Sequence, residues 1–315
     1  MRMLLQMPRP DEVVLKEFEL WFDKVFEREF KPVLYNFNYC HKAWFNHLCK
    51  KKQVEVAPYY PEINPIDFIP ISIKNIKEYN TYTNFVKSEK QCGNGCKTRC
   101  ICSPGPAYKY IMGPITYELE QIMKKHIHGY QVPENWEALE KFLDHMEICG
   151  LIATVQLDGK SFDMTQNIHL KRIVDHKIYR YVKQFVHHVD QNVFEAVATA
   201  EERYVVPNVR VDGKVKSFGS VMLRGQVFSG SMDTTLMNTL RMSMFVRFCM
   251  DRAGVPGKVL VKGDDTSVFI SPVHIPALVK SIGEIFCTEE EWLANPEIIK
   301  GLGLISKFIK IGAIS

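Results

Sequence analysis

The spacing of hydrophobic positions changes along the chain between helical and strand-like periods, which predicts a protein of mixed α and β structure. Residues 12–30 carry apolar and aromatic side chains at the spacing of one helix face and predict a largely amphipathic helix. Prolines interrupt residues 56–73 and predict an extended segment that runs over a surface. In residues 151–158 apolar and polar side chains alternate, which predicts a strand that ends at Asp158.

The second half of the chain carries clear boundary signals. A helix is predicted between Asp233, a residue type that suits an N-cap, and Gly254, a residue type that suits a helix end and that a proline soon follows. Two short β-rich runs, 259–262 and 266–270, flank a Gly-Asp-Asp tripeptide. This arrangement predicts a β-hairpin with the two aspartates at its tip.

Length and composition narrow the class of protein. The 315 residues are 46% hydrophobic and 24% charged, which excludes a disordered or collagen-like chain and favours a globular protein of two or three lobes. Every apolar run is shorter than the roughly 20 residues that span a bilayer, so no transmembrane segment is expected. The nine cysteines, with no export signal at the start of the chain, predict reduced thiols in a cytoplasmic protein.

The distribution of charge along the chain is more informative than the net charge. The net charge of +4 is too small to identify a nucleic-acid binder, but basic residues in 87–109 oppose only Glu89, and such a segment attracts phosphates. A solvated surface loop is the simpler interpretation of this stretch taken alone. Zinc binding by four cysteines in the stretch stays open, because their spacing is not the usual two close pairs. These cysteines are Cys92, Cys96, Cys100 and Cys102.

Three aspartates lie at positions where a charged carboxylate is unfavourable for folding unless it has a functional role. Asp158 ends an apolar strand, and Asp264 and Asp265 are adjacent at the predicted hairpin tip. Neighbouring like charges repel, and a bound cation relieves the repulsion. Mg²⁺, or Mn²⁺ in its place, is the natural candidate because it takes oxygen ligands and substrate phosphates. A Gly-Asp-Asp tripeptide taken alone is more often an ordinary polar turn.

The order of several motifs along the chain favours a functional role for the Gly-Asp-Asp tripeptide over an ordinary polar turn. The segments FVKSEK, KTRCICSPGPAYKYI, LDGKSFD, SGSMDTTLMN and VKGDD follow one another with sensible gaps. Together they resemble the RNA-dependent RNA polymerases of positive-strand RNA viruses, most closely those of the tombusvirus-like group. The resemblance extends over residues 85–310, about two-thirds of the chain.

The resemblance implies a particular architecture. We expect an α+β right-hand polymerase fold with fingers and an antiparallel palm sheet that brings Asp158 to the Gly-Asp-Asp hairpin. Residues 1–150 would form the fingers, with an N-terminal region and the basic motif that covers the entering triphosphate. Residues 151–315 would form the palm, with a fingers insertion near 170–217. The family continues into a thumb domain beyond this point, so we expect a thumb that is absent, truncated or supplied by another chain.

The aspartates take roles from the same resemblance. Asp158 and Asp163 match the first catalytic motif, in which the first aspartate binds both metal ions and the second lies near the ribose of the incoming nucleotide. Asn238 joins Asp163 in sensing the 2′-hydroxyl, which distinguishes RNA from DNA precursors. Asp264 is the expected second metal ligand, and Asp265 supports it.

Further residues that match the motifs of this family are expected to contact the nucleotide. Ser229 and Gly230 match a loop that leads into a helix, and Thr234 shares a helix face with Asn238 because the two are four positions apart. Lys307, in a late palm motif, is the candidate general acid for the pyrophosphate leaving group, although a surface lysine is the commoner explanation. The residues that match the basic triphosphate motif are Lys87, Lys90, Lys97 and Arg99.

The implied function is template-directed RNA synthesis by a two-metal mechanism, with RNA template, nascent RNA, ribonucleoside triphosphates and other viral replication proteins as partners. The implied location is the host cytoplasm, at membranes only through a partner. A reverse transcriptase shares the palm and the metal aspartates, but Asn238 with Asp163, and a glycine before Asp264, disfavour it. A truncated noncatalytic RNA-binding protein is the third interpretation, and it predicts salt-sensitive RNA binding without metal-dependent incorporation.

Overall fold

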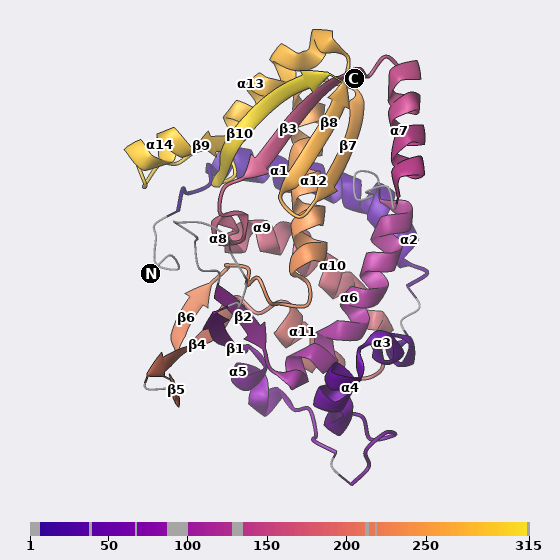
Figure 1. Ribbon diagram of the computed structural model, residues 1–315, viewed down its shortest axis with the longest axis vertical. Helices are drawn as coiled ribbons and strands as arrows, with labels where there is room; N and C mark the ends of the chain where they lie inside the picture. The colour runs from indigo at the N-terminus through magenta and orange to yellow at the C-terminus, as the bar shows by residue number, and fades with distance from the viewer. Residues whose placement is uncertain are drawn as a thin grey trace. The chain divides into compact units, whose positions relative to one another are not determined.

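The computed structural model shows helices and strands that alternate along the chain in an α+β fold (Figure 1). The residues it describes are 7–37, 40–66, 68–86, 100–127, 135–211, 214–217 and 219–313. They cluster into unit 1, which comprises Met1–Asn36, Glu120–Val174 and Thr235–Ser315, and unit 2, which comprises Phe37–Leu119 and Asp175–Thr234. The predicted α+β class is confirmed, and the assignment of fingers and palm stays a prediction.

Unit 1 is built on a five-stranded sheet in the order β7-β8-β3-β10-β9 (Figure 1). Its strands are β3 Ala153–Gly159, β7 Gly257–Lys262, β8 Asp265–Ile270, β9 Phe286–Thr288 and β10 Leu304–Ala313. The pairs β7–β8, β8–β3 and β3–β10 are antiparallel, whereas β9 pairs with β10 in parallel. The sheet is therefore mixed and departs from the purely antiparallel sheet expected, because the connection through α14 (Glu289–Ala294) is long enough to return the chain for a parallel pairing.

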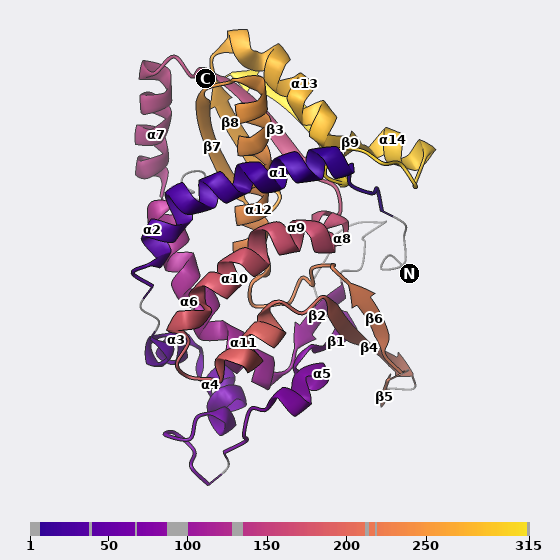
Figure 2. The same cartoon turned by 180° about the vertical axis from the view of Figure 1, so that it is seen from behind.

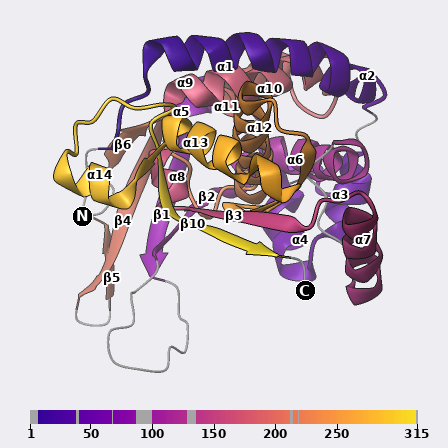
Figure 3. The same cartoon turned by 90° about the horizontal axis from the view of Figure 1, so that it is seen from above.

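Helices α1 (Glu12–Val25), α12 (Thr234–Ala253) and α13 (Ile275–Ile285) cover one face of this sheet (Figures 2 and 3). The predicted N-terminal amphipathic helix is confirmed as α1, which continues as a π-helical turn over Phe26–Phe30. Phe18 of α1 packs against Phe245 and Phe248 of α12, each at a ring-centroid distance of 5.3 Å. This aromatic contact joins two helices that are far apart in the sequence.

The helix predicted between Asp233 and Gly254 is also confirmed. It begins at Thr234 and ends at Ala253, and Gly254 then adopts a φ of +64° that suits a residue without a side chain. Its middle is buried almost all round, which is typical of a helix at the centre of a unit. Unit 1 is completed by α2 (Lys31–Leu34), α7 (Trp136–Ile148), α8 (Phe162–Thr165), α9 (Ile168–Lys171) and a 3₁₀ turn over Pro272–His274.

Unit 2 holds a second five-stranded sheet in the order β2-β1-β4-β5, with β6 also paired to β4. Its strands are β1 Thr81–Val86, β2 Cys100–Pro104, β4 Glu202–Val211, β5 Lys214–Ser217 and β6 Val221–Arg224. Only β1–β4 is parallel among these described pairs. Its helices are α3 His41–His47, α4 Lys50–Val56, α5 Ile76–Tyr79, α10 Lys177–Val182 and α11 Gln191–Ala198, with 3₁₀ turns over Ala57–Tyr59, Ile73–Asn75 and Lys183–Phe185. Helix α6 (Pro106–His126) and the π-helical turn over Arg172–His176 each run from one unit into the other.

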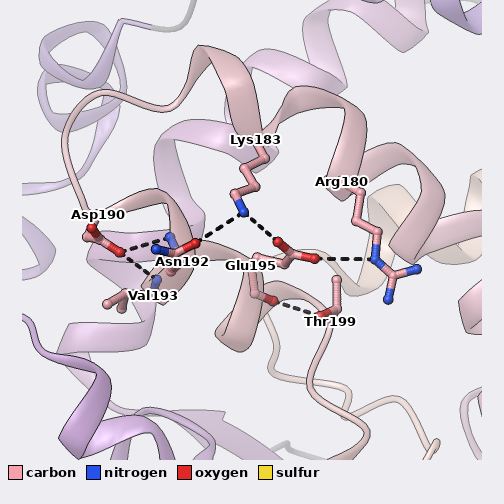
Figure 4. Close-up of polar contacts among 7 residues, drawn as sticks. All are labelled: Arg180, Lys183, Asp190, Asn192, Val193, Glu195 and Thr199. Carbon is pink, nitrogen blue, oxygen red and sulfur yellow. Dashed lines mark hydrogen bonds and ion pairs between the residues drawn. The ribbon is translucent and has the colours of Figure 1, made fainter.

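A polar network joins α10 and its following turn to α11 (Figure 4). Lys183 Nζ contacts Glu195 Oε2 at 2.7 Å, and Arg180 Nε lies 3.4 Å from Glu195 Oε1. Asp190 caps α11 by accepting the backbone N–H groups of Asn192 and Val193. The hydrogen bond from Lys183 is the main reason that the pKa of Glu195 is lowered. Because these side chains are partly exposed, their ion pairs add little stability.

The predicted extended segment at residues 56–73 is largely irregular in its described part. A 3₁₀ turn over Ala57–Tyr59 begins it, and the following described residues up to 72 carry no helix or strand. Among all described residues, no helix combines the length and the hydropathy that crossing a membrane requires.

Candidate active site

The sheet of unit 1 brings together the aspartates that the sequence singled out. In the antiparallel pair β3–β8, Asp158 and Asp265 are direct partners in register. Partners of this kind have Cα atoms roughly 4.5–5.5 Å apart. Gly263 and Asp264 form the two-residue turn between β7 and β8, next to this pair. Three aspartates therefore lie near one another in the backbone at one end of neighbouring strands.

The tip of the β7–β8 hairpin is held in place by helix α12. Gly263 has a φ of +68°, and a glycine at the first central position is typical of a type II′ hairpin turn. Its backbone N–H donates to Thr239 Oγ1 at 2.9 Å, and the same hydroxyl donates to Thr235 O at 2.7 Å. Sequence reasoning missed Thr239, whose only signal was its place beside Asn238.

The electrostatics at the hairpin favour a cation. Burial is the main cause that raises the pKa of Asp264, and the negative charges of Asp265, Asp158 and Asp163 raise it further. A carboxyl group whose pKa rises because of neighbouring carboxylates lies where a positive ion lowers the electrostatic energy. The charge pattern therefore suits a divalent metal with phosphate ligands.

Lys307 supplies one positive charge to this cluster. Its Nζ donates to Asp158 Oδ2 at 2.8 Å, and the pKa of Lys307 is raised, chiefly by that hydrogen bond. The register of β10 against β3 shifts between Ser306 and Phe308, so Lys307 is the extra residue of a β-bulge. Bulges redirect a side chain beside a site, and here the result is an ion pair with Asp158. The general-acid role stays a prediction.

The arrangement of the predicted metal ligands can be compared with what a divalent metal ion requires. Among the described residues, no three or more His, Cys, Asp or Glu side chains are grouped closely enough to hold a metal ion by themselves. Asp158, Asp264 and Asp265 are thus neighbours in the sheet without forming a closed cage. Mg²⁺ is commonly held by one or two carboxylates, with water and substrate phosphates completing the shell. The aspartates fit that open kind of site.

Asp163 and Asn238, which the sequence paired as sugar-sensing residues, are in contact. Asn238 Nδ2 donates to Asp163 Oδ1 at 2.5 Å, and Arg241 donates to Asn238 Oδ1 at 2.6 Å. Burial raises the pKa of Asp163, while the hydrogen bond from Asn238 and the charge of Arg241 act in the opposite direction. Sequence reasoning missed Arg241, although a guanidinium three positions after Asn238 on a buried helix was a usable signal.

The loop before α12 belongs to unit 2. Ser229 is exposed. A Cβ on Gly230 would lie 2.4 Å from the carbonyl oxygen of Cys102, so only glycine allows the loop to approach β2 this closely. Thr234 Oγ1 donates to Phe228 O at 2.5 Å, which ties the hydroxyl to the loop backbone. The nucleotide contacts expected of these residues stay predictions.

A buried polar cluster lies directly behind this loop. The carboxylate of Asp233 accepts hydrogen bonds from Ser231 Oγ at 2.6 Å and from Tyr179 Oη at 2.9 Å. Tyr108 Oη lies 2.9 Å from Ser231 Oγ, and the buried Arg203 guanidinium lies over the Tyr108 ring. Asp233 was predicted only as a helix cap, because a sequence pattern does not reveal these partners.

The basic motif cannot be placed beside the aspartates. Lys87, Lys90, Lys97 and Arg99 lie outside the described residues, in the connection between β1 and β2. Of the four cysteines considered for zinc, Cys92 and Cys96 lie outside the described residues, and the side chain of Cys100 is not described. Cys102 is buried in β2.

No protein-family model and no curated protein matches this chain.

Proposed function

We propose that this protein is an RNA-directed RNA polymerase of the type found in positive-strand RNA viruses of the tombusvirus-like group. The observation that carries the proposal is the register of β3 and β8, in which Asp158 faces Asp265 beside a Gly-Asp turn. The order of motifs along the chain supports it independently. RNA template, nascent RNA and ribonucleoside triphosphates are the proposed partners, together with other viral replication proteins in the host cytoplasm.

The proposed reaction is the attack of a 3′-hydroxyl oxygen on the α-phosphorus of a ribonucleoside triphosphate. The oxygen loses its proton and forms a phosphodiester bond, while the bond between the α- and β-phosphates breaks and pyrophosphate leaves. Asp158, Asp264 and Asp265 would hold the metal ions, and Lys307 would leave its ion pair with Asp158 when a cation arrives. Two bound metal ions stabilise the entering and leaving oxygens of such a displacement. Clustered carboxylates that repel one another without a cation are suited to this task, and at Asp264 this repulsion adds to the effect of burial, which is the main cause of its raised pKa.

The contact between Asp163 and Asn238 favours ribonucleotides as substrates. A hydrogen-bonded amide and carboxylate offer a donor and an acceptor, which match a hydroxyl group that is itself both. Such a site rejects an analogue without the hydroxyl, because its buried polar groups would lose their partner. This argument favours an RNA polymerase over a reverse transcriptase.

The test is incorporation of a labelled ribonucleotide on a primed RNA template with Mg²⁺ or Mn²⁺. We expect wild-type incorporation, and we expect Asp264→Asn to reduce it to background while RNA binding persists. Asp144→Asn, a change of the same chemistry on the exposed side of α7, is the matched control and should retain activity.

Two outcomes would contradict the proposal. An Asp264→Asn protein that extends the primer at the wild-type rate would exclude the metal-aspartate mechanism. A wild-type chain that binds RNA and incorporates neither ribonucleotides nor deoxyribonucleotides with either metal would favour the noncatalytic RNA-binding alternative.

A further inference from the structure

Arg241 is a charged side chain in the centre of unit 1. It has no exposed surface and lies within a run of buried residues of α12. A buried guanidinium is costly unless hydrogen bonds and charge compensate it. Its NH2 group donates to Asn238 Oδ1 at 2.6 Å, which directs this strong donor at a residue of the candidate site.

The chemistry of the three side chains fixes the direction of each contact. Arginine only donates hydrogen bonds, so the atom of Asn238 that faces Arg241 is the amide oxygen. The amide nitrogen then faces Asp163, whose carboxylate accepts at 2.5 Å. Arg241 and Asp163 thereby favour the same one of the two orientations that an asparagine amide can adopt.

The helix geometry makes this arrangement local and rigid. Asn238 and Arg241 are three positions apart in α12 and therefore share a face of the helix. Asp163 comes from α8, directly after β3. Among the described residues, only Asp163 accepts a hydrogen bond from Asn238 Nδ2, so the second N–H of that nitrogen is available to a ligand.

We propose that Arg241 is a positioning residue for sugar selection, which holds the Asn238 amide so that its nitrogen faces Asp163 and the 2′-hydroxyl of the incoming ribonucleotide. The inference rests on the proposed polymerase function and adds a residue to it. Without Arg241, the amide oxygen of Asn238 loses its donor, and the contact with Asp163 alone holds the amide in place. The contact between the Asn238 amide nitrogen and the 2′-hydroxyl would then form in only a fraction of the protein molecules.

A merely structural role for Arg241 predicts a different result. Loss of a buried arginine lowers stability whatever its partner is, and it would lower the incorporation of both kinds of nucleotide together. A positioning role instead lowers kcat/KM for the ribonucleotide and leaves kcat/KM for the matching deoxyribonucleotide nearly unchanged. The ratio of the two values separates the roles.

The experiment compares kcat/KM for a ribonucleotide and its 2′-deoxy analogue in the wild type, Arg241→Met and Arg241→Lys. We expect the ratio to fall about tenfold in Arg241→Met, the loss of one hydrogen bond made by a charged group. Arg247→Met is the matched control, because Arg247 lies on the same helix, is 14% exposed and pairs with Glu29 at 2.7 Å. It should lower stability and keep the ratio.

A double variant supplies the second measurement. Asn238→Ala should itself lower the ratio, and Arg241→Lys in that background should lower it no further, because Arg241 acts through Asn238. This comparison also applies if Arg241→Met fails to fold.

The inference is overturned if the Arg241 variants discriminate as the wild type does, or if their effects add fully to that of Asn238→Ala. A wild-type protein that incorporates no nucleotide, or that prefers the deoxyribonucleotide, overturns the proposed function and the inference with it.

Discussion

His188 should make the folding of unit 2 sensitive to mild acid. Its Nε2 lies 3.1 Å from Tyr110 O, and Tyr110 Oη donates to His188 O at 3.1 Å. Burial lowers the pKa of His188 from 6.5 to about 4, against the smaller opposing effect of the hydrogen bond to Tyr110. The ring is therefore neutral in the folded protein throughout the mildly acidic range.

The sign of the effect follows from proton uptake. Below pH 6.5 the unfolded chain protonates this histidine and the folded chain does not, so acidification favours unfolding. The stabilisation is present above pH 6.5 and is lost as the pH falls toward 4. At about 1.4 kcal/mol per pKa unit, the full difference between 6.5 and about 4 is about 3 kcal/mol, of which about 2 kcal/mol is lost by pH 5.

The assay is urea unfolding at pH 7 and pH 5, with the free energy of unfolding taken from each curve. We expect His188→Gln, whose amide can still donate to Tyr110 O, to lose about 2 kcal/mol less than the wild type between these two pH values. His187→Gln, at an exposed neighbouring position, is the control and should behave as the wild type does. An equal loss in His188→Gln and the wild type would refute the reasoning.

Two further predictions concern single side chains in separate units. Lys307→Met removes the ammonium group that pairs with Asp158 at 2.8 Å, so Mn²⁺ should bind at a lower concentration in a direct titration. Unchanged or weaker binding would contradict competition between Lys307 and the metal. Gly230→Ala places a Cβ 2.4 Å from the carbonyl oxygen of Cys102 and should lower the free energy of unfolding by about 1–3 kcal/mol. Gly105→Ala, where a Cβ meets nothing within 4 Å, should not show this overpacking loss, and equal effects of the two changes would exclude the steric explanation.

Local signals in the sequence predicted the elements that carry the site. Periodicity and end signals identified α1, β3, α12 and the β7–β8 hairpin, since each depends on residues close to one another in the chain. The contact between Asp163 and Asn238 was expected only through the resemblance, because it joins residues 75 positions apart.

The missed features depend on tertiary neighbours. Arg241 and Asp233 are ordinary polar residues in the sequence, and only the surrounding packing reveals that one orients an amide and the other accepts hydrogen bonds from buried hydroxyl groups. The parallel pairing of β9 was missed for a similar reason. Strand β9 has only three residues between two helices, which is too short to show a strand-like alternation of apolar and polar side chains.

The bulge at Lys307 has an evolutionary consequence. Because this residue is the extra one between Ser306 and Phe308, it takes no part in the alternation of inward and outward side chains along β10. Natural selection can therefore replace residue 307 without disturbing the buried face of the strand. Deleting it would leave Ser306 opposite Gly159 and Phe308 opposite Asp158, so regular alternation would continue through the former bulge and the ion pair with Asp158 would be lost. Related chains that lack this residue should thus keep the buried face of β10 but lose the positive charge beside Asp158.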